Sequence, residues 1–297
     1  MRPLFPDESA PPDERAALEA PGGVRLFTQR WTPDDDPRAV VALVHGYGEH
    51  SSRYRHVAAF LRERGYAVHA YDQRGHGRSQ GRRTYVDSFG DYTRDLALVL
   101  DQVRARRAGG APLFLMGHSM GGTVSAFYVL REQPDDLAGL VLSSPALAIT
   151  GARWLGPVAG ALSRLWPTLP TSRIDHTKLS RDPAVARHVE RDAFMHRGRM
   201  PVRTASELMR AVRHVQAQAD RLTLPLLCWH GTADAIVPLA GTRRFHERAA
   251  SSDKTFRRYE DFYHETLNEP ERRDVLQDLA DWLKRRTADR RRRATAS

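Results

Sequence analysis

The 297-residue sequence predicts an α/β protein with a mostly parallel central sheet, helices on both faces of the sheet, and a helical cap inserted late in the chain. Three observations support this fold class. Short apolar runs alternate with segments of helical periodicity, at the spacing typical of strand–helix–strand units. Several runs are apolar at every position, as expected for strands buried on both faces. After Pro145 the alternation stops for about 75 residues, which indicates a helical insertion.

The expected elements follow one another along the chain. We expect strands over residues 24–31, 39–44, 66–71, 113–116, 137–142, 225–229 and 254–259. We expect helices over 54–64, 88–107, 120–131 and 271–286 around them, and over 154–169, from 182 onward and over 204–219 in the insertion. These patterns divide the chain into a core of residues 21–148 and 223–287 and a cap of residues 149–222.

The two ends of the chain differ in composition from the body. Residues 1–20 are rich in proline and charge, so we predict a flexible N-terminal segment. Residues 284–297 carry seven basic residues and one acid, which supply +6 of the net charge of +10. We therefore predict that 288–297 is a basic, flexible tail and that the body binds no nucleic acid. Contact of the tail with an anionic lipid surface or nucleic acid stays open.

Several classes of protein are excluded by composition. No apolar run reaches the length of a transmembrane helix, and residues 1–23 lack the apolar stretch of a signal peptide. The single cysteine, Cys228, excludes an intramolecular disulfide and a cysteine-built metal cluster. We expect a cytoplasmic protein, with peripheral membrane contact through the cap left open.

The strongest chemical motif is Gly117-His-Ser-Met-Gly121, which follows an expected strand and precedes an expected helix. In that context G-x-S-x-G predicts a nucleophile elbow, a strained turn that exposes the serine hydroxyl at a helix N-terminus. We therefore predict that Ser119 is a nucleophile. The alternative, a glycine-rich packing turn, is less consistent with the flanking strand and helix.

A serine nucleophile needs a histidine base and an acid that orients the base. Asp234 is the only carboxylate in the loop after the expected strand 225–229, and His264 follows the last expected strand. This chain order predicts Asp234 as the acid and His264 as the base. Asp261 is the competing acid, but it lies too close in sequence to His264 to be preferred.

An oxyanion hole requires two backbone N–H groups aimed at the reacting oxygen. The elbow offers the N–H of Met120. The second donor is expected in the glycine-containing loop His45-Gly-Tyr-Gly-Glu-His50, from the N–H of Tyr47. A simple turn is the alternative for this loop.

Taken together, the motifs resemble the monoacylglycerol lipase and lysophospholipase branch of the α/β-hydrolase fold. The segments that carry the resemblance are His45-Gly-Tyr-Gly-Glu-His50, Asp72-Gln-Arg-Gly-His-Gly-Arg-Ser79, Gly117-His-Ser-Met-Gly-Gly122, His230-Gly-Thr-Ala-Asp234 and Tyr263-His-Glu265. The resemblance implies a Ser119–Asp234–His264 triad with Tyr47 and Met120 at the oxyanion hole. It also implies that Glu49 and Arg53 lie near a glycerol head.

These observations predict a serine hydrolase that cleaves single-chain acyl esters, above all monoacylglycerol, beneath a cap over an apolar acyl tunnel. No metal or organic cofactor is expected, because the triad suffices. A lysophospholipase, a general carboxylesterase or an acyl thioesterase would use the same chemistry, since fold alone does not choose the ester. A non-catalytic acyl-binding protein is the alternative from another class. The apolar residues of 154–169 fit either cap packing or contact with membranes or micelles.

Overall fold

The computed structural model describes residues 11–107, 110–148 and 163–296, and within them one sheet of eight strands in the order β1-β2-β4-β3-β5-β6-β7-β8. The strands are β1 Glu14–Ala20, β2 Val24–Trp31, β3 Ala39–Val44, β4 Tyr66–Tyr71, β5 Leu113–His118, β6 Leu137–Ser143, β7 Leu226–Gly231 and β8 Lys254–Tyr259. Strand β2 is antiparallel to both of its neighbours, and the other pairs are parallel. The predicted mostly parallel sheet is confirmed.

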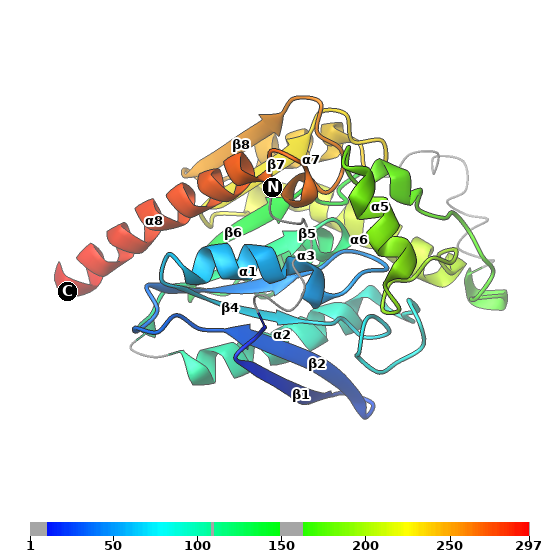
Figure 1. Cartoon of the computed structure of the whole chain (residues 1–297), viewed down its shortest axis with the longest axis horizontal. Coiled ribbons are helices and arrows are strands. Elements are labelled where there is room, and N and C mark those ends of the chain that lie inside the picture. The colour runs from blue at the N-terminus through cyan, green and yellow to red at the C-terminus, as the bar shows by residue number, and fades with distance from the viewer. Residues whose placement is uncertain (1–10, 108–109, 149–162, 297) are drawn as a thin grey trace.

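Helices cover both faces of the sheet (Figure 1). Helices α1 (Arg55–Arg62) and α8 (Arg272–Ala296) share a core with Val41 and Leu43 of β3. On the other face, the core around Val40, Ala42 and Val44 includes side chains from four further helices, namely α2 (Phe89–Arg106), α3 (Met120–Glu132), α6 (Val202–Ala217) and α7 (Leu239–Arg248). Successive strand residues point to opposite faces, so the apolar run of β3 contributes to both cores.

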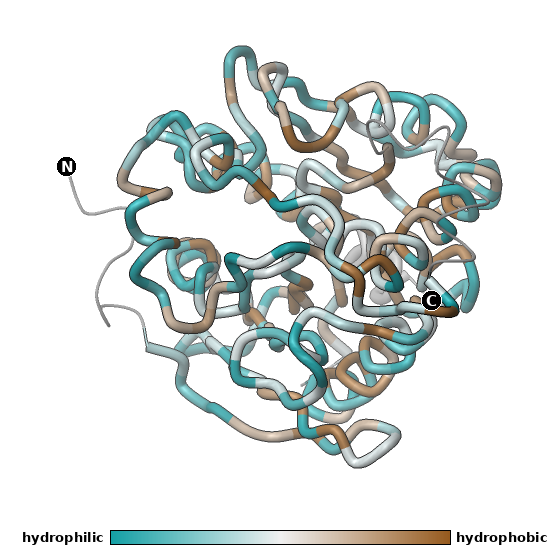
Figure 2. Tube along the Cα trace, turned by 90° about the vertical axis from the view of Figure 1, so that its right-hand side faces the viewer, coloured by the Kyte–Doolittle hydropathy of each residue, from teal (hydrophilic) through white to brown (hydrophobic). Residues whose placement is uncertain are grey.

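The polarity of the chain follows this layering. Figure 2 shows hydrophilic residues along the outer loops and hydrophobic residues concentrated in the interior of the molecule. Local signals set the helix ends: α2 begins after Ser88, whose side chain and that of Asp91 form a reciprocal capping box. Helix α7 was not predicted, because only Gly241, Thr242 and Phe245 of its residues are buried and they give a weak apolar pattern.

The prediction that residues 1–20 are flexible is wrong for Glu14–Ala20, which form β1. This strand pairs with β2 over its whole length and lies at the edge of the sheet. Its even-numbered residues are less exposed than its odd-numbered ones, as expected for a strand with one face on the protein. An edge strand tolerates many charged residues, which is why its composition resembles that of a disordered segment.

The tail predicted at 288–297 has helical backbone as far as Ala296, since α8 continues to that residue. Alanine and arginine are strong helix formers, so the sequence after Arg286 can extend a helix that is already nucleated by the core. In Figure 1 this helix, coloured red, leaves the body of the molecule and ends well beyond the sheet.

The predicted cap, 149–222, is partly described. Residues 149–162, which hold most of the helix expected over 154–169, lie outside the described residues. Helix α5 (Pro183–Arg191) confirms the helix predicted from Asp182, whose side chain caps it. Helix α6 was expected to belong to the cap, but Ala211 and Val215 lie in the main core with α2 and α3. In the described chain, the stretch before α6 has a small apolar cluster of its own, formed by Leu179, Val185, Val189 and Met195.

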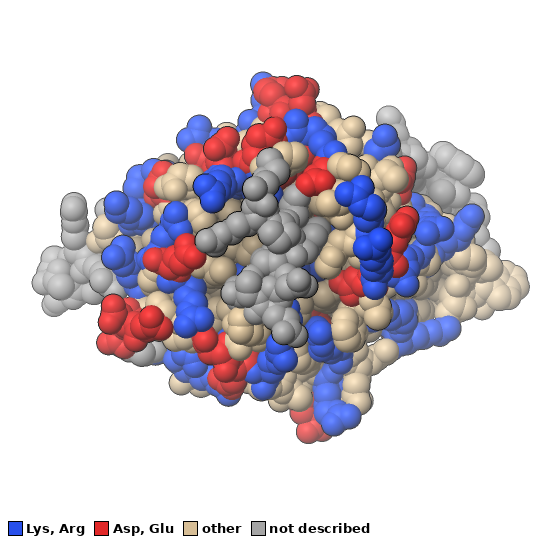
Figure 3. All heavy atoms as spheres, viewed as in Figure 1, with Lys and Arg blue, Asp and Glu red and all other residues tan. Residues whose placement is uncertain are grey.

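The charge on the surface is mixed in sign. On the face shown in Figure 3, basic and acidic side chains are interspersed, with no broad area of a single sign. In the part of the chain that the structure describes, no helix combines the length and apolar character needed to cross a membrane.

Candidate active site

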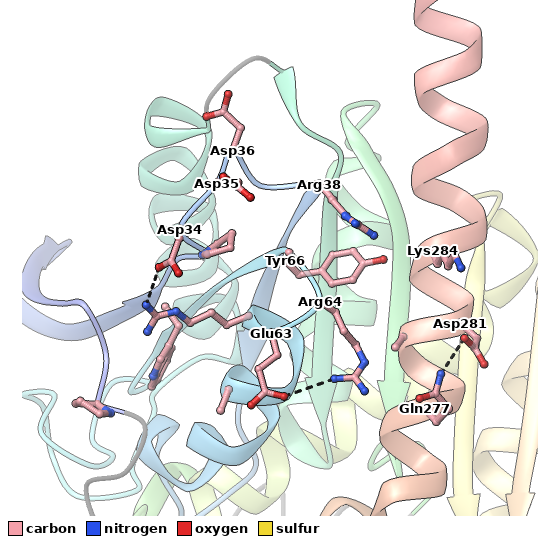
Figure 4. Close-up of a pocket in the computed structure, with 17 residues that line it drawn as sticks. Asp34, Asp35, Asp36, Arg38, Glu63, Arg64, Tyr66, Gln277, Asp281 and Lys284 are labelled. Atoms are coloured by element: carbon pink, nitrogen blue, oxygen red, sulfur yellow. Dashed lines mark hydrogen bonds and ion pairs between the residues drawn. The ribbon is translucent and has the colours of Figure 1, made fainter.

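One large cavity of the described chain lies away from the predicted nucleophile. It has a volume of about 790 Å³ and lies at the amino ends of β3 and β4, between the loop before β3, α1 and α8 (Figure 4). Figure 4 shows acidic and basic side chains around it, among them Asp34, Arg38 and Lys284. No serine, threonine, cysteine or histidine is among its described lining residues, so it offers no nucleophile of the predicted serine type and no imidazole base.

The predicted nucleophile lies at the opposite, carboxyl ends of the strands, in the turn between β5 and α3. Ser119 has φ +52° and ψ −121°, a strained conformation for a residue with a side chain. The turn is tight: a Cβ at Gly117 would lie 2.4 Å from the carbonyl oxygen of Gly121, and one at Gly121 would lie 2.3 Å from that of Val44. The two outer glycines of the motif are therefore required by close backbone packing.

The three residues predicted as a triad form one hydrogen-bonded chain. Ser119 Oγ lies 2.9 Å from His264 Nε2, and His264 Nδ1 lies 2.7 Å from Asp234 Oδ2. Each residue follows the carboxyl end of a parallel strand, namely β5, β7 or β8, so the sheet brings together positions that are far apart in sequence. The competing acid, Asp261, donates its backbone N–H to Thr232, and no hydrogen bond joins its side chain to His264 in the described chain.

Asp234 is a buried carboxylate whose oxygens accept from several protein donors. Its Oδ1 accepts the N–H groups of Ile236 at 2.8 Å and Val237 at 2.9 Å, and His230 Nε2 lies 2.9 Å from Oδ2. Burial alone raises the pKa of Asp234, but the charge of His264 and these hydrogen bonds hold it well below its usual range. Asp234 is therefore an anion that can orient an imidazole.

His264 is buried between this anion and Ser119. Burial alone lowers the pKa of His264, but the charge and hydrogen bond of Asp234 raise it above its usual value. The neighbouring His118 ring lies 4.9 Å away between centroids, and its Nδ1 contacts Ser143 Oγ at 3.1 Å. Burial and the charge of His264 lower the pKa of His118 to about 4, so His118 is a neutral packing residue beside the base.

The loop predicted to supply an amide donor lies directly beside the nucleophile. A Cβ at Gly46 would be 3.1 Å from Ser119 Cβ, so Tyr47 follows the point of closest approach. Among the described residues no hydrogen-bond acceptor is found for the Tyr47 N–H. Met120 is the first residue of α3, where an N–H has no intrahelical acceptor. The amides of Tyr47 and Met120 therefore remain the candidate oxyanion donors.

Comparison with known proteins relates the whole chain to one family. A family model described as serine aminopeptidase, S33, matches residues 35–271. Monoacylglycerol lipase of Mycolicibacterium smegmatis is 39% identical over 264 residues, which cover 88% of this chain and 94% of the relative. Human monoglyceride lipase is 33% identical over 286 residues, covering 95% of this chain and 94% of its own. The chain belongs to the monoacylglycerol lipase branch of the α/β-hydrolase family. It is a serine ester hydrolase.

A solved structure agrees with this assignment. The crystal structure of Paleococcus ferrophilus monoacylglycerol lipase superimposes with a TM-score of 0.78 at 32% identity, covering 88% of this chain and 99% of that one. The predicted α/β-hydrolase fold and the resemblance to this branch are both confirmed.

The other two residues that the family resemblance singled out form a buried ionic cluster beside the nucleophile. Arg53 donates to Glu49 Oε2 at 2.8 Å, while Glu49 Oε1 accepts the Gly46 N–H at 2.5 Å and the Tyr54 hydroxyl at 2.7 Å. Burial alone raises the pKa of Glu49, but the charge of Arg53, helped by nearby histidines and the Tyr54 hydrogen bond, lowers it to about 2. Glu49 and Arg53 are thus close to the reaction centre, as expected, and they are paired with each other.

Sequence reasoning missed a third member of this cluster, Glu265. Its two oxygens accept from Arg53 at 2.5 and 2.8 Å, and Asn268 Nδ2 donates to it at 2.7 Å. The only sequence signal was its position directly after His264, which does not reveal that the side chain turns toward Arg53.

Residues of the predicted cap cover this site in the described conformation. Ile174, Leu179 and Met195 line the cavity that contains Ser119 and His264, and its volume is about 20 Å³. A cavity of this size has room for about one water molecule and none for an acyl chain. The apolar acyl tunnel expected from the sequence is therefore not open in the part of the chain that the structure describes, and entry of a substrate requires cap side chains to move.

Proposed function

We propose that this enzyme hydrolyses monoacylglycerol to glycerol and a fatty acid through an acyl-enzyme on Ser119. The observation that carries the chemistry is the hydrogen-bonded chain from Ser119 through His264 to Asp234. The similarity to monoacylglycerol lipases over most of the chain supports this choice of ester.

In the acylation step, Ser119 Oγ attacks the ester carbonyl carbon while His264 Nε2 takes the hydroxyl proton. Negative charge develops on the carbonyl oxygen and is stabilised by the N–H groups of Tyr47 and Met120. The carbon–oxygen bond to glycerol then breaks, and the imidazolium gives its proton to the departing glycerol oxygen. Asp234 holds the ring orientation and stabilises its positive charge in both states.

Deacylation repeats these roles with water as the nucleophile. His264 takes a proton from water as the water oxygen attacks the acyl carbon, and the same two amides stabilise the second tetrahedral oxygen. The bond to Ser119 Oγ breaks, the serine recovers its proton from His264, and the fatty acid leaves. The complete hydrolysis consumes one water molecule, and these steps use no cofactor.

The charge of the buried cluster favours a neutral head group over a phosphate. Arg53 is hydrogen-bonded to two carboxylates, those of Glu49 and Glu265, so the three groups together carry a net negative charge. A neutral glycerol head can form hydrogen bonds with these charged groups. A phosphate placed beside them is repelled by their net negative charge. This observation favours monoacylglycerol over a lysophospholipid.

Competing hydrolysis of two matched lipids tests this proposal. We expect a medium-chain monoacylglycerol to be hydrolysed at least about tenfold faster than the lysophosphatidylcholine of equal chain length. A tenfold difference corresponds to about 1.4 kcal/mol. Fatty-acid release is measured with Ser119→Ala as the blank.

Faster release from the lysophospholipid would make a lysophospholipid the substrate in place of monoacylglycerol. Cleavage of neither, with Ser119 still labelled by a fluorophosphonate, would point to another ester or thioester. Binding of acyl ligands without labelling or turnover would favour the non-catalytic alternative.

We also infer that the cap contacts lipid aggregates when it takes up substrate. Leu165, Trp166 and Leu169 are 68%, 59% and 40% exposed, and they are the large hydrophobic residues that lie most exposed in the described chain. They belong to the predicted cap, in the chain between β6 and α5. Exposed apolar side chains of this kind are typical of interfacial contact. A cytoplasmic location stays a prediction from the single cysteine.

The basic end of the chain is expected to be dispensable for the chemistry. Leu283 and Thr287 of α8 are buried, and a deletion of residues 288–297 leaves both of them in place. We predict that this deletion leaves kcat on a water-soluble short-chain ester within about twofold of the full chain, because surface changes usually alter stability by no more than about 0.5 kcal/mol. Initial rates and thermal melts of the two proteins check this. A large fall in kcat at unchanged melting temperature would show that the end of α8 contributes to the active site.

A further inference from the structure

Glu265 occupies an unusual place in the site, because it follows the base directly and yet turns its side chain toward another loop. The residue is 5% exposed, and both carboxylate oxygens accept from the Arg53 guanidinium. Asn268, three residues later, donates to the same carboxylate at 2.7 Å. Glu265 is thus fixed in one orientation by three donor contacts in a nearly water-free setting.

Arg53 links Glu265 to the loop that holds Tyr47, the proposed amide donor. Arg53 is 3% exposed and also donates to Glu49, which in turn accepts the Gly46 N–H at 2.5 Å. Gly46 directly precedes Tyr47. A continuous series of charge-assisted hydrogen bonds therefore joins the loop after β8, which holds the base, to the loop after β3, which holds the proposed oxyanion donor.

We propose that Glu265 is a positioning residue for the hydrolytic reaction, which fixes the Tyr47 loop relative to His264 through Arg53 and Glu49 and supplies a negative charge that favours the protonated base. This inference rests on the proposed function, because it assigns Glu265 a part in steps carried out by His264 and Tyr47.

The electrostatics are consistent with both parts of this role. Burial alone raises the pKa of Glu265, but the charge and hydrogen bonds of Arg53 lower it, so Glu265 is an anion. The cluster of two carboxylates and one guanidinium has a net negative charge, which attracts the His264 ring only when that ring carries a proton. His264 carries that proton in the transition states of both steps, so the cluster stabilises them more than the resting enzyme.

The charged and titratable groups near His264 come from every loop of the site. They are Asp234 from the loop after β7 with His230 beside it, Tyr47, Glu49 and Arg53 from the loop after β3, His118 at the end of β5, His176 and His196 from the predicted cap, and Glu265 itself. Only the carboxylates favour the imidazolium, and Asp234 acts most strongly. Removal of the Glu265 charge should therefore lower the pKa of His264 without abolishing its orientation.

The test is Glu265→Gln in the full-length enzyme, assayed on a water-soluble short-chain ester across pH. We expect kcat to fall about tenfold or more and the acid limb of kcat/KM to move to lower pH by about half a unit, where one unit corresponds to 1.36 kcal/mol. Glu265→Asp retains the charge but shortens the reach to Arg53, so its kcat should fall while its acid limb stays in place. Glu271→Gln, which removes a half-exposed carboxylate paired with Arg181, is the matched control and should leave both quantities unchanged.

A purely structural clamp would lower the melting temperature without moving the acid limb. An unchanged kcat and acid limb in folded Glu265→Gln would therefore overturn the proposal. If that variant does not fold, Glu265→Asp takes its place, and a kcat equal to wild type in Glu265→Asp would overturn the proposal as well. Wild-type turnover and fluorophosphonate labelling of Ser119 are measured in the same series. Their absence would contradict the proposed function itself, and the two failures are thus distinguishable.

Discussion

Ser119→Ala is expected to lower kcat by about 10⁴- to 10⁶-fold, since removal of a triad serine in other hydrolases has an effect of this size. The variant loses the atom that forms the acyl-enzyme, whereas the amides of Tyr47 and Met120 and the cap remain in place. Alanine has the same Cβ as serine, so the strain of the elbow is unchanged and the fold should be retained. Turnover of a soluble ester, fluorophosphonate labelling and a thermal melt measure the three properties.

A matched serine separates chemistry from general effects of the substitution. Ser206 lies buried on α6, away from the elbow, and accepts from Arg210. Ser206→Ala should retain wild-type kcat and labelling. Activity similar to wild type in Ser119→Ala, with the control also active, would remove Ser119 from the mechanism.

Asp234→Asn should lower kcat at neutral pH by about 10⁴-fold, as in the serine proteases where the corresponding exchange leaves geometry intact. Asp234 accepts a hydrogen bond from the N–H at His264 Nδ1. This leaves Nε2 unprotonated and able to accept a hydrogen bond from Ser119. An amide can present its NH₂ group to Nδ1 and so favour the opposite tautomer, in which Nε2 carries the proton and cannot act as the base. The kcat of the purified variant at neutral pH gives the result.

The rival acid supplies the control for this prediction. Asp261 has φ +62°, a conformation that asparagine adopts readily, so Asp261→Asn is expected to fold normally and to retain activity. If Asp261→Asn were the inactive variant and Asp234→Asn the active one, the assignment of the acid would be reversed.

The core strands could be predicted from sequence because the pattern of a doubly buried strand is strong. The runs at β3 and β4 are buried at every position, and their predicted bounds agree with the structure. Edge strand β1 was missed, since half of its residues face solvent and its charged positions hide the alternation. The helical continuation of α8 was missed because a high charge content is also typical of disordered segments, although its residues have high helix propensity.

The site residues divide in a similar way. Ser119, Asp234 and His264 could be predicted because the fold fixes their order along the chain and each follows a strand that is itself easy to recognise. Glu265 could not, since its partner Arg53 is 212 positions away and the pairing depends on how two loops meet above the sheet. Charged residues in loops acquire a role only from such contacts, which a single sequence does not display.

The direction of α8 determines how far its end lies from a lipid surface that contacts the predicted cap. In Figure 1 the cap segment next to the grey trace lies at one end of the long axis of the molecule, and α8 leaves the opposite end. A flat lipid surface that receives Trp166 and its apolar neighbours, as proposed above, would therefore lie far from the end of α8. The proposed lipid contact and the end of this helix would thus not share one surface.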